Sequence, residues 1–362
     1  MTAPNWVDVG AADELAKAKV SRCVTTTAKL AVSFKDGVFG AVASACNHVG
    51  GPLGQGTLDG DHIVCSWHQW RFHRCTGKGG SDAEGNVPSY PVKVDQGRVL
   101  VDVAAATPRA GAKRTPHPLA CAVERAPGPL RIAGISTTAM DPAHPRFSGS
   151  DHLLKIALES AAADGAETQM IRLDDLNFRA CRGYYSKAAR ACTWPCSITQ
   201  MHADDELTPV YEALVHWADA IIVATPIRWG AASSLYFKMA ERLNCIQNAI
   251  TTHDRVLIRN KVAGFIIVGG QDNIQSVAGQ MIGFFAELGF LFPQFPYIAH
   301  SRGWSHEDME TNVEVVRTSP ELAEGARELA QRCLDRAEEL LASAGTPATI
   351  ARGGRKANAG QS

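Results

Sequence analysis

The chain has 362 residues, enough for two domains that each bury a hydrophobic core, and its formal net charge of −1 gives no signal for binding nucleic acid or an anionic membrane surface. The first ten residues contain Asp8 and no apolar run, and no stretch is apolar for long enough to cross a bilayer, so we expect neither a secretory signal nor a membrane anchor. Ten cysteines in such a chain favour reduced thiols or metal ligands over a disulfide framework, and a cytoplasmic location.

Residues 5–103 alternate short β-type runs with Gly, Asp and Asn, which predicts a small all-β domain. The segments Lys35-Asp36-Gly37 and Asp95-Gln96-Gly97 indicate hairpin turns. The expected strands are Leu30–Phe34, Gly37–Ala43, His62–Val64, Val92–Val94 and Arg98–Val103.

Two short segments of this domain each carry one cysteine and one histidine. Cys46 and His48 form a C-x-H motif, and Cys65 and His68 form a C-x2-H motif further along the chain. Two thiolates on one iron and two imidazoles on the other make up the ligand set of a Rieske [2Fe–2S] centre. A Cys2His2 zinc site uses the same residue types, but zinc fingers usually group the cysteines and the histidines in separate pairs, whereas here each segment supplies one of each.

The residues around these ligands suit loops that hold a cluster. Gly50, Gly51 and Gly54 allow close backbone approach, so that amide N–H groups can point at bridging sulfurs. Pro52 stiffens the first loop.

Over about residues 5–103 the chain resembles the Rieske ferredoxins. The resemblance implies that Cys46 and Cys65 hold one iron while His48 and His68 hold the other. High-potential relatives carry a further cysteine in each loop, joined as a disulfide. Gly51 and Trp67 stand at those two positions, so that disulfide cannot form here. We therefore expect a cluster near the low end of the Rieske range, roughly −150 mV rather than +300 mV.

Residues 104–130 are dominated by Ala, Pro, Arg and Lys, a composition that cannot bury a core and that indicates a semi-extended linker. We interpret its basic residues as solvating charges rather than a partner site. They are Arg109, Lys113, Arg114 and Arg125.

From Leu130 onward, buried strands alternate with amphipathic helices, which specifies a doubly wound, five-stranded parallel sheet in an α/β domain spanning 131–342. The expected strands cover residues 131–136, 170–173, 219–225, 262–268 and 293–299. The expected helices cover residues 151–163, 207–217, 234–244, 273–288 and 320–342. Residues 343–362 are rich in Gly, Ala and polar residues, and we expect a disordered tail there.

Ligands of such sheets bind beyond the carboxyl ends of the strands, and phosphate groups bind at helix N-termini. The loop 136–150 is rich in hydroxyl groups and holds Arg146 just before the first helix, which suits a monophosphate. No G-x-G-x-x-G motif follows the first strand, which argues against a dinucleotide fold. The glycine-rich run 50–56 precedes a strand and belongs to the cluster loop.

A second loop, Thr225-Pro226-Ile227-Arg228-Trp229-Gly230, follows the third strand. Together with Gly269-Gly270-Gln271-Asp272 and the segment from Gly289-Phe290 to Gly303-Trp304, it makes residues 130–310 similar to flavodoxin-like NAD(P)H-dependent FMN reductases and iron–sulfur flavoproteins. The resemblance implies bound FMN. It places the phosphate at Ser136, Arg146, Ser148 and Ser150, the isoalloxazine at Pro226, Ile227, Arg228, Trp229 and Gly230, and the flavin edge near Gly269 and Gly270. The alternatives are that Trp229 merely packs a loop and that Arg146 is a surface cation.

Three further cysteines, Cys181, Cys192 and Cys196, lie between the second strand and the next helix, where iron–sulfur flavoproteins place a four-cysteine cluster motif. Tyr184 and Lys187 stand at the places of the second and third cysteines of that motif. A second cluster and ordinary buried or zinc-tolerant thiols both stay open.

The combination predicts an electron-transfer oxidoreductase. A nicotinamide delivers two electrons as hydride and an iron–sulfur cluster accepts one at a time, whereas a flavin does both. We expect NAD(P)H to reduce FMN, and single electrons to pass to the cluster or to an external acceptor, with no catalytic acid or base from the protein.

One alternative is a carrier or redox sensor without turnover. The other is a Rieske oxygenase, whose two-histidine, one-carboxylate iron site the remaining histidines do not indicate. The resemblance also implies a homodimer or tetramer. The acceptor and the choice between NADH and NADPH stay open.

Overall fold

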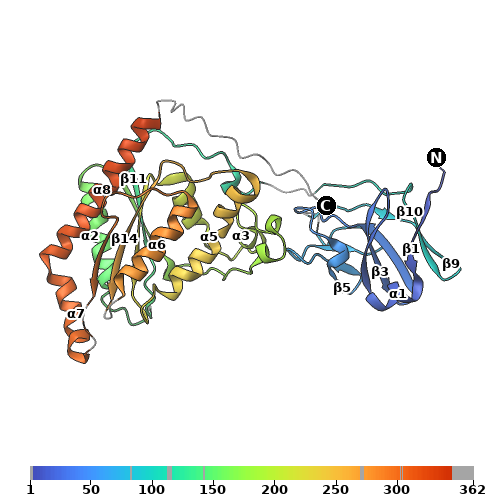
Figure 1. Cartoon of the computed structure of the whole chain (residues 1–362), viewed down its shortest axis with the longest axis horizontal. Coiled ribbons are helices and arrows are strands. Elements are labelled where there is room, and N and C mark those ends of the chain that lie inside the picture. The colour runs from blue at the N-terminus through green and yellow to red at the C-terminus, as the bar shows by residue number, and fades with distance from the viewer. Residues whose placement is uncertain are drawn as a thin grey trace. The chain divides into compact units, whose positions relative to one another are not determined.

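The computed structural model describes residues 3–81, 84–111, 116–141, 143–269, 273–301, 303 and 305–344. The chain divides into two compact units. The first consists of Met1–Cys121, Arg179–Ala203 and Asn248–Arg255, and the second of Ala122–Phe178, Asp204–Gln247 and Val256–Ser362. Figure 1 shows the N-terminal strands in blue and the elements of the second unit in green to red. The first unit thus includes a segment that follows the second strand of the predicted α/β region.

The N-terminal part of the first unit is built from small antiparallel sheets, which confirms the predicted all-β architecture. One sheet has the order β1 (Trp6–Ala11), β10 (Arg98–Asp102) and β9 (Val92–Asp95). A second has β2 (Val20–Val24), β3 (Lys29–Lys35), β4 (Val38–Ala43) and β8 (Ser89–Tyr90). The third has β5 (Thr57–Asp59), β6 (His62–Val64) and β7 (Arg71–His73).

Both predicted hairpin turns are present. Asp36 and Gly37 have φ values of 50° and 80°, and Gln96 and Gly97 have values of 47° and 76°. Two consecutive residues with positive φ are typical of the type I′ turn, whose twist matches that of the flanking strands. These turns therefore fix the registers of β3 with β4 and of β9 with β10.

The second unit is built on a parallel sheet of order β12-β11-β13-β14-β15, which confirms the flavodoxin-like doubly wound fold. The strands are β11 (Arg131–Ser136), β12 (Glu167–Arg172), β13 (Ala220–Pro226), β14 (Val262–Gly269) and β15 (Tyr297–Ser301). The strand β12 lies on one side of β11 and the later strands lie on the other, so the strand order reverses between β11 and β13. The loops after these two strands therefore flank the switch point of the sheet.

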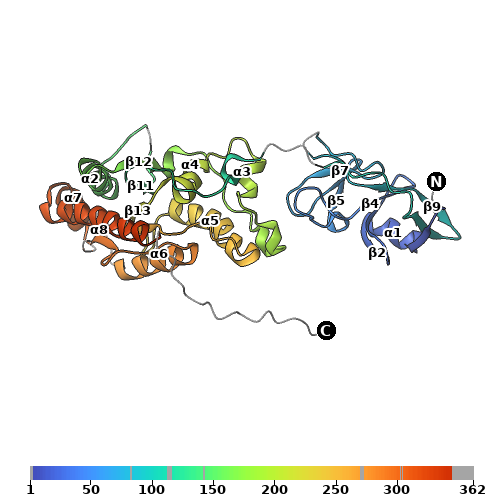
Figure 2. The ribbon, with the colours of Figure 1, turned by 90° about the horizontal axis from the view of Figure 1, so that it is seen from above.

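Helices cover both faces of this sheet (Figure 2). On one face, α2 and α8 share a buried cluster with Ile222 and Ile266. Phe265 has the opposite side-chain direction along β14 and packs on Phe285 of α6, with ring centroids 5.5 Å apart. The helices are α2 (Gly149–Ala163), α4 (Thr208–Tyr211), α5 (Ser234–His253), α6 (Ile274–Leu288), α7 (His306–Thr318) and α8 (Pro320–Ala344). Among the described residues, none of the helices is long and apolar enough to cross a membrane.

Several predicted element bounds are corrected. The last strand begins at Tyr297 rather than at Pro293, because Pro293 and Pro296 lack the N–H that a ladder needs. The helix predicted for 234–244 runs on to His253, and the one predicted for 207–217 splits into α4 and a π-helical turn, Glu212–Trp217.

Several helices were not predicted from the sequence. They are α1 (Ala12–Ala18), α3 (Ser197–Met201), α7, and 3-10 turns at Leu53–Gln55, Pro118–Ala120, Leu173–Asp175, Tyr184–Ser186 and Ala189–Ala191. Of the predicted tail, residues 343 and 344 belong to α8, and residues 345–362 lie outside the described residues.

Candidate functional site

The two predicted histidine ligands converge on one point in the first unit. The Nδ1 atoms of His48 and His68 lie 2.7 Å apart, and the ring planes are inclined by 76°. His68 is only 2% exposed. Two imidazole nitrogens aimed at the same place can ligate one metal ion together.

The two predicted cysteine ligands are buried beside each other, at 4% and 1% exposure for Cys46 and Cys65. The hydrogen bond with the Cys46 thiol and the backbone N–H groups of Trp67 and His68 lower the pKa of Cys65 to about 7. The same thiol pair and burial raise the pKa of Cys46. One sulfur of the pair therefore ionises readily, and thiolate is the form that binds metal.

Both ligand loops have the same backbone closure in spite of their different C-x-H and C-x2-H spacing. Cys46 N donates to Gly51 O (2.9 Å) and Gly50 N donates to Cys46 O (3.0 Å). In the second loop, Cys65 N donates to Trp70 O (2.8 Å) and Gln69 N donates to Cys65 O (3.0 Å). The fourth residue after each cysteine has positive φ, 79° at Gly50 and 60° at Gln69. Two equivalent loops thus present one cysteine and one histidine each.

This donor set fits a binuclear cluster. Among the described residues, no three or more His, Cys, Asp or Glu side chains gather around one point, as a single-ion site would require. The four ligands instead form one sulfur pair and one nitrogen pair, which is the division between the two irons of a Rieske centre. The loops also pack tightly, since a Cβ on Gly51 would lie 2.8 Å from Cys65 Sγ and 3.1 Å from the Trp67 ring.

Aromatic and backbone groups surround the histidines. The indole of Trp70 stacks on His48, with centroids 4.9 Å apart and planes within 15°. The backbone oxygen of Ala191 lies 2.6 Å from His68 Nε2, and the Tyr184 ring packs edge-on against His68 at 5.0 Å. Ala191 and Tyr184 belong to the segment Arg179–Ala203, which the sequence did not connect with this site.

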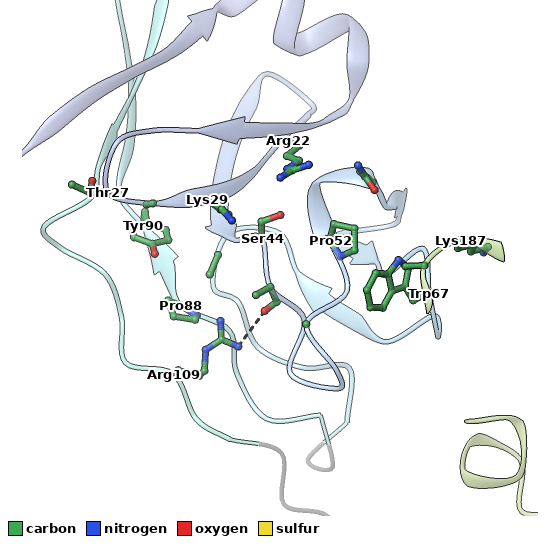
Figure 3. A pocket seen from close by; sticks show the side chains of 16 residues that line it. Arg22, Thr27, Lys29, Ser44, Pro52, Trp67, Pro88, Tyr90, Arg109 and Lys187 are labelled. Carbon is green, nitrogen blue, oxygen red and sulfur yellow. Dashed lines mark hydrogen bonds between the residues drawn. The ribbon is translucent and has the colours of Figure 1, made fainter. Parts of the chain in front are cut away.

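A basic hollow of about 700 Å³ lies beside the ligand loops (Figure 3). Four cationic side chains line it together with the aromatic rings of Trp67 and Tyr90, and none of the described residues that line it carries a carboxylate. The cations are Arg22, Lys29, Arg109 and Lys187. This arrangement favours an anionic ligand or an acidic partner surface.

Two of the basic linker residues, interpreted as solvating charges, are exposed and also make hydrogen bonds or ion pairs within the chain. Arg109 donates to the backbone oxygen of Ala45 (3.1 Å) and to Asn47, and so holds the first ligand loop. Arg125 pairs with the buried Asp219 at 2.8 Å. Lys113 and Arg114 lie outside the described residues.

In the second unit, hydroxyl groups converge where β11 ends and α2 begins. Thr138 Oγ1 lies 3.0 Å from Ser148 Oγ and 2.9 Å from Ser150 Oγ. Ser148 also caps α2 by accepting a hydrogen bond from Asp151 N. This hydroxyl cradle, formed by Thr138, Ser148 and Ser150, lies at a helix N-terminus, where backbone N–H groups and the helix dipole favour a phosphate. Thr138 is not among the residues predicted to bind the phosphate.

Ser136 is oriented differently from Ser148 and Ser150. Its buried hydroxyl donates to Asp151 Oδ1, and the other oxygen of Asp151 pairs with Arg172 Nη1 at 2.7 Å. Its proton is thus engaged with a carboxylate. Direct contact between Ser136 and a phosphate therefore stays a prediction.

Two of the predicted arginines, Arg146 and Arg228, are close enough to influence each other electrostatically. Arg146 donates to the backbone oxygen of Ala139 at 3.1 Å. Desolvation and the Arg146 guanidinium lower the pKa of Arg228. Two neighbouring cations repel unless an anion lies between or beside them, which suits a phosphate.

The second predicted flavin loop forms a tight turn. Arg228 and Ala231 exchange backbone hydrogen bonds of 2.7 and 3.0 Å around Trp229 and Gly230, which have φ values of 51° and 72°. The Trp229 side chain is 95% exposed, so the alternative that it packs a loop is wrong. Its ring is available as a platform for an aromatic ligand.

The neighbouring positions explain the shape of this loop. Ile227 is buried and touches Gly269, where an added Cβ would lie 2.5 Å from the isoleucine side chain. Pro226 is the last residue of β13. Ser233 Oγ donates to the backbone oxygen of Thr137 at 2.6 Å, which joins this loop to the end of β11. The predicted edge residue Gly270 lies outside the described residues.

Of the three further cysteines, Cys196 is buried, while Cys181 and Cys192 are partly exposed. Gly183 N donates to Cys181 Sγ at 3.3 Å. Whether these thiols bind a metal stays a hypothesis.

Comparisons with known proteins match each of the two parts of the chain. Residues 5–91 match the Rieske [2Fe-2S] domain, and residues 142–305 match the NADPH-dependent FMN reductase family. The ferredoxin component of the naphthalene 1,2-dioxygenase system of Pseudomonas aeruginosa is 31% identical over 99 residues, 27% of this chain and 95% of that protein.

Relatives of the second half are matched over a smaller share of their length. An iron-sulfur flavoprotein of Methanocaldococcus jannaschii is 27% identical over 146 residues, 40% of this chain and 64% of that protein. The 8-demethyl-8-aminoriboflavin-5'-phosphate synthase of Streptomyces davaonensis is 24% identical over 158 residues, 41% of this chain and 55% of that protein. The chain therefore belongs to the Rieske ferredoxin family through its N-terminal part and carries an NADPH-dependent FMN reductase domain behind it.

Proposed function

We propose that this chain is an NAD(P)H-dependent electron-transfer oxidoreductase that uses FMN in its second unit and a Rieske [2Fe–2S] cluster in its first. The observation that carries the proposal is the presence, in one chain, of paired sulfur and nitrogen ligands and of a hydroxyl cradle at the N-terminus of α2. When bound, FMN supplies the exchange between a two-electron hydride donor and a one-electron acceptor.

The residues of the first unit have distinct roles in this proposal. Cys46 and Cys65 would hold one iron through sulfur, and His48 and His68 would hold the other through Nδ1. Burial of both thiols keeps water from the sulfurs, and backbone N–H groups stabilise their negative charge. Trp70 restricts the orientation of the His48 ring by stacking on it.

The second unit binds and orients the nucleotide. Thr138, Ser148 and Ser150 offer hydroxyl groups to the phosphate, and the cations Arg146 and Arg228 balance its charge. The ring of Trp229, which is exposed, would contact the isoalloxazine. No side chain of this site is needed as an acid or a base.

The test is an anaerobic titration of the purified protein with NADPH and, separately, NADH, followed by visible absorbance and EPR. We expect the flavin absorbance to bleach and the EPR signal of a reduced Rieske cluster to rise. Cys65→Ser should lose iron and sulfide and keep flavin bleaching, whereas Cys75→Ser, a cysteine of the same unit away from the ligand pairs, should behave as wild type. Bleaching of neither chromophore in the wild-type protein would reject the proposal.

The basic hollow beside the ligand loops favours a second candidate, a carrier that delivers electrons to an acidic acceptor. Its four cations include Arg22 and Lys29, both exposed. Reduction of an acidic acceptor protein should then slow steeply as salt rises, and Arg22→Ala with Lys29→Ala should weaken that dependence. A salt-independent rate would speak against this candidate and leave the first one standing.

A further inference from the structure

The segment Arg179–Ala203 contacts the second ligand loop at three places. Ala191 O lies 2.6 Å from His68 Nε2, the Tyr184 ring lies edge-on against His68, and Lys187 Nζ donates to Ser66 O at 2.6 Å. Both Ala191 and His68 are almost completely buried, at 0% and 2% exposure. These contacts converge on one ligand and its loop.

The Ala191 contact determines which nitrogen of His68 carries the proton. A backbone oxygen can only accept a hydrogen bond, so Nε2 must be the donor. In the neutral ring, Nδ1 then bears the lone pair, and Nδ1 is the atom that faces His48 Nδ1. The backbone of this segment therefore selects the tautomer that ligates through Nδ1.

The position of Ala191 is fixed by a buried side chain from α5. Asn248 Nδ2 donates to Ala189 O (2.8 Å) and to Cys192 O (2.7 Å), one on each side of Ala191. Asn248 is 6% exposed, and Ala191 N donates to Ala188 O at 2.8 Å. The short turn is thus held in place independently of His68.

We propose that residues 184–192, held by Asn248, form a seat for His68 that sets the reduction potential of the cluster. The proposal rests on the function proposed above, because it requires that His68 ligate iron. Asn248 is a positioning residue in this scheme, since it acts on His68 through the turn.

Two groups of the seat, the backbone oxygen of Ala191 and the Lys187 ammonium, act on the potential in opposite directions. An acceptor on Nε2–H makes the ring a more basic ligand, which stabilises the oxidised cluster. The Lys187 ammonium is a nearby positive charge and stabilises the reduced, more negative cluster. Asn248→Ala should therefore raise the potential, and Lys187→Met should lower it.

The experiment is a redox titration of the full chain followed by EPR, with the ENDOR spectrum of the histidine nitrogens recorded on the same samples. We expect Lys187→Met to reduce the equilibrium constant for cluster reduction by about tenfold, equivalent to about 59 mV for one electron. Asn248→Ala should raise that constant severalfold and change the nitrogen hyperfine coupling of one histidine.

Matched controls separate this effect from general damage. Lys17→Met removes a charge from the exposed face of α1, and Asn312→Ala removes an asparagine hydrogen bond from α7. Both should titrate as wild type. Tyr184→Phe should retain the edge-on contact and wild-type values, whereas Tyr184→Ala should change the hyperfine coupling.

The outcomes distinguish the two proposals. A wild-type protein without iron, sulfide or a Rieske EPR signal overturns both. A wild-type signal with unchanged potential and hyperfine coupling in Lys187→Met and Asn248→Ala overturns the seat alone. Because Lys187 is exposed, its variant provides the result even where Asn248→Ala fails to fold.

Discussion

Substitution of Gly51 provides a stringent test of the cluster site. A Cβ at this position would lie 2.8 Å from Cys65 Sγ and 3.1 Å from the Trp67 ring, well inside the roughly 3.5–4.0 Å of an optimal contact. The sulfur cannot retreat freely, because metal–ligand distances tolerate only about 0.2 Å. Overpacking of this kind costs about 1–3 kcal/mol. Since about 1.4 kcal/mol corresponds to a factor of ten, Gly51→Ala should weaken cluster retention by about 5- to 150-fold.

Gly50 supplies a matched control in the same loop. It has a positive φ of 79°, and a Cβ there would meet no atom within 4 Å. Gly50→Ala therefore carries only the backbone cost of a left-handed residue, about 1–2 kcal/mol, without touching the sulfur. Iron and acid-labile sulfide per chain, measured after gel filtration against a chelator, compare the two variants. If Gly51→Ala loses its cluster to the chelator no faster than the wild-type protein, the packing argument is refuted.

Three further predictions concern the second unit. Thr138→Ala and Ser150→Ala should each weaken FMN binding by about 1 kcal/mol and leave the binding of riboflavin, which lacks the phosphate, unchanged. Flavin fluorescence measures both affinities, and equal losses of affinity for the two flavins would contradict a phosphate cradle. Burial lowers the pKa of Lys261 from 10.5 to about 8, so between these pH values the unfolded chain binds more protons than the folded chain and stability rises with pH. Relative to Lys261→Met, the free energy of unfolding of the wild-type protein, measured by urea titration, should rise by up to about 3 kcal/mol from pH 8 to pH 10.5. Parallel pH profiles of the two proteins would disprove this prediction. Arg242→Met should lower the free energy of unfolding by about 3–5 kcal/mol, because it removes one partner of the buried Arg242–Asp205 ion pair (2.8 Å). A urea midpoint close to that of the wild-type protein would show that Asp205 finds water or another donor.

Part of the flavin site could not be predicted from the sequence. The resemblance to FMN reductases implied Ser148 and Ser150 as phosphate ligands, and these two hydroxyl groups do lie together. Thr138 was not predicted, because a threonine ten residues earlier approaches them only when the loop folds back onto α2. Ser136 was assigned to the phosphate on the same grounds, whereas its hydroxyl is engaged with Asp151. Hydroxyl residues in a loop do not reveal which of them point into a cradle.

The sequence by itself determined the fold class and predicted the cluster ligands. Metal ligation restricts residue types, so Cys46, His48, Cys65 and His68 are recognisable from local spacing, and buried strands are recognisable from their runs of apolar residues. Tertiary structure alone decided that Arg179–Ala203 joins the first unit and that Ala191 O and Asn248 support His68. A backbone oxygen is present at every residue and leaves no mark in the sequence, so its role depends on contacts between segments far apart in the chain.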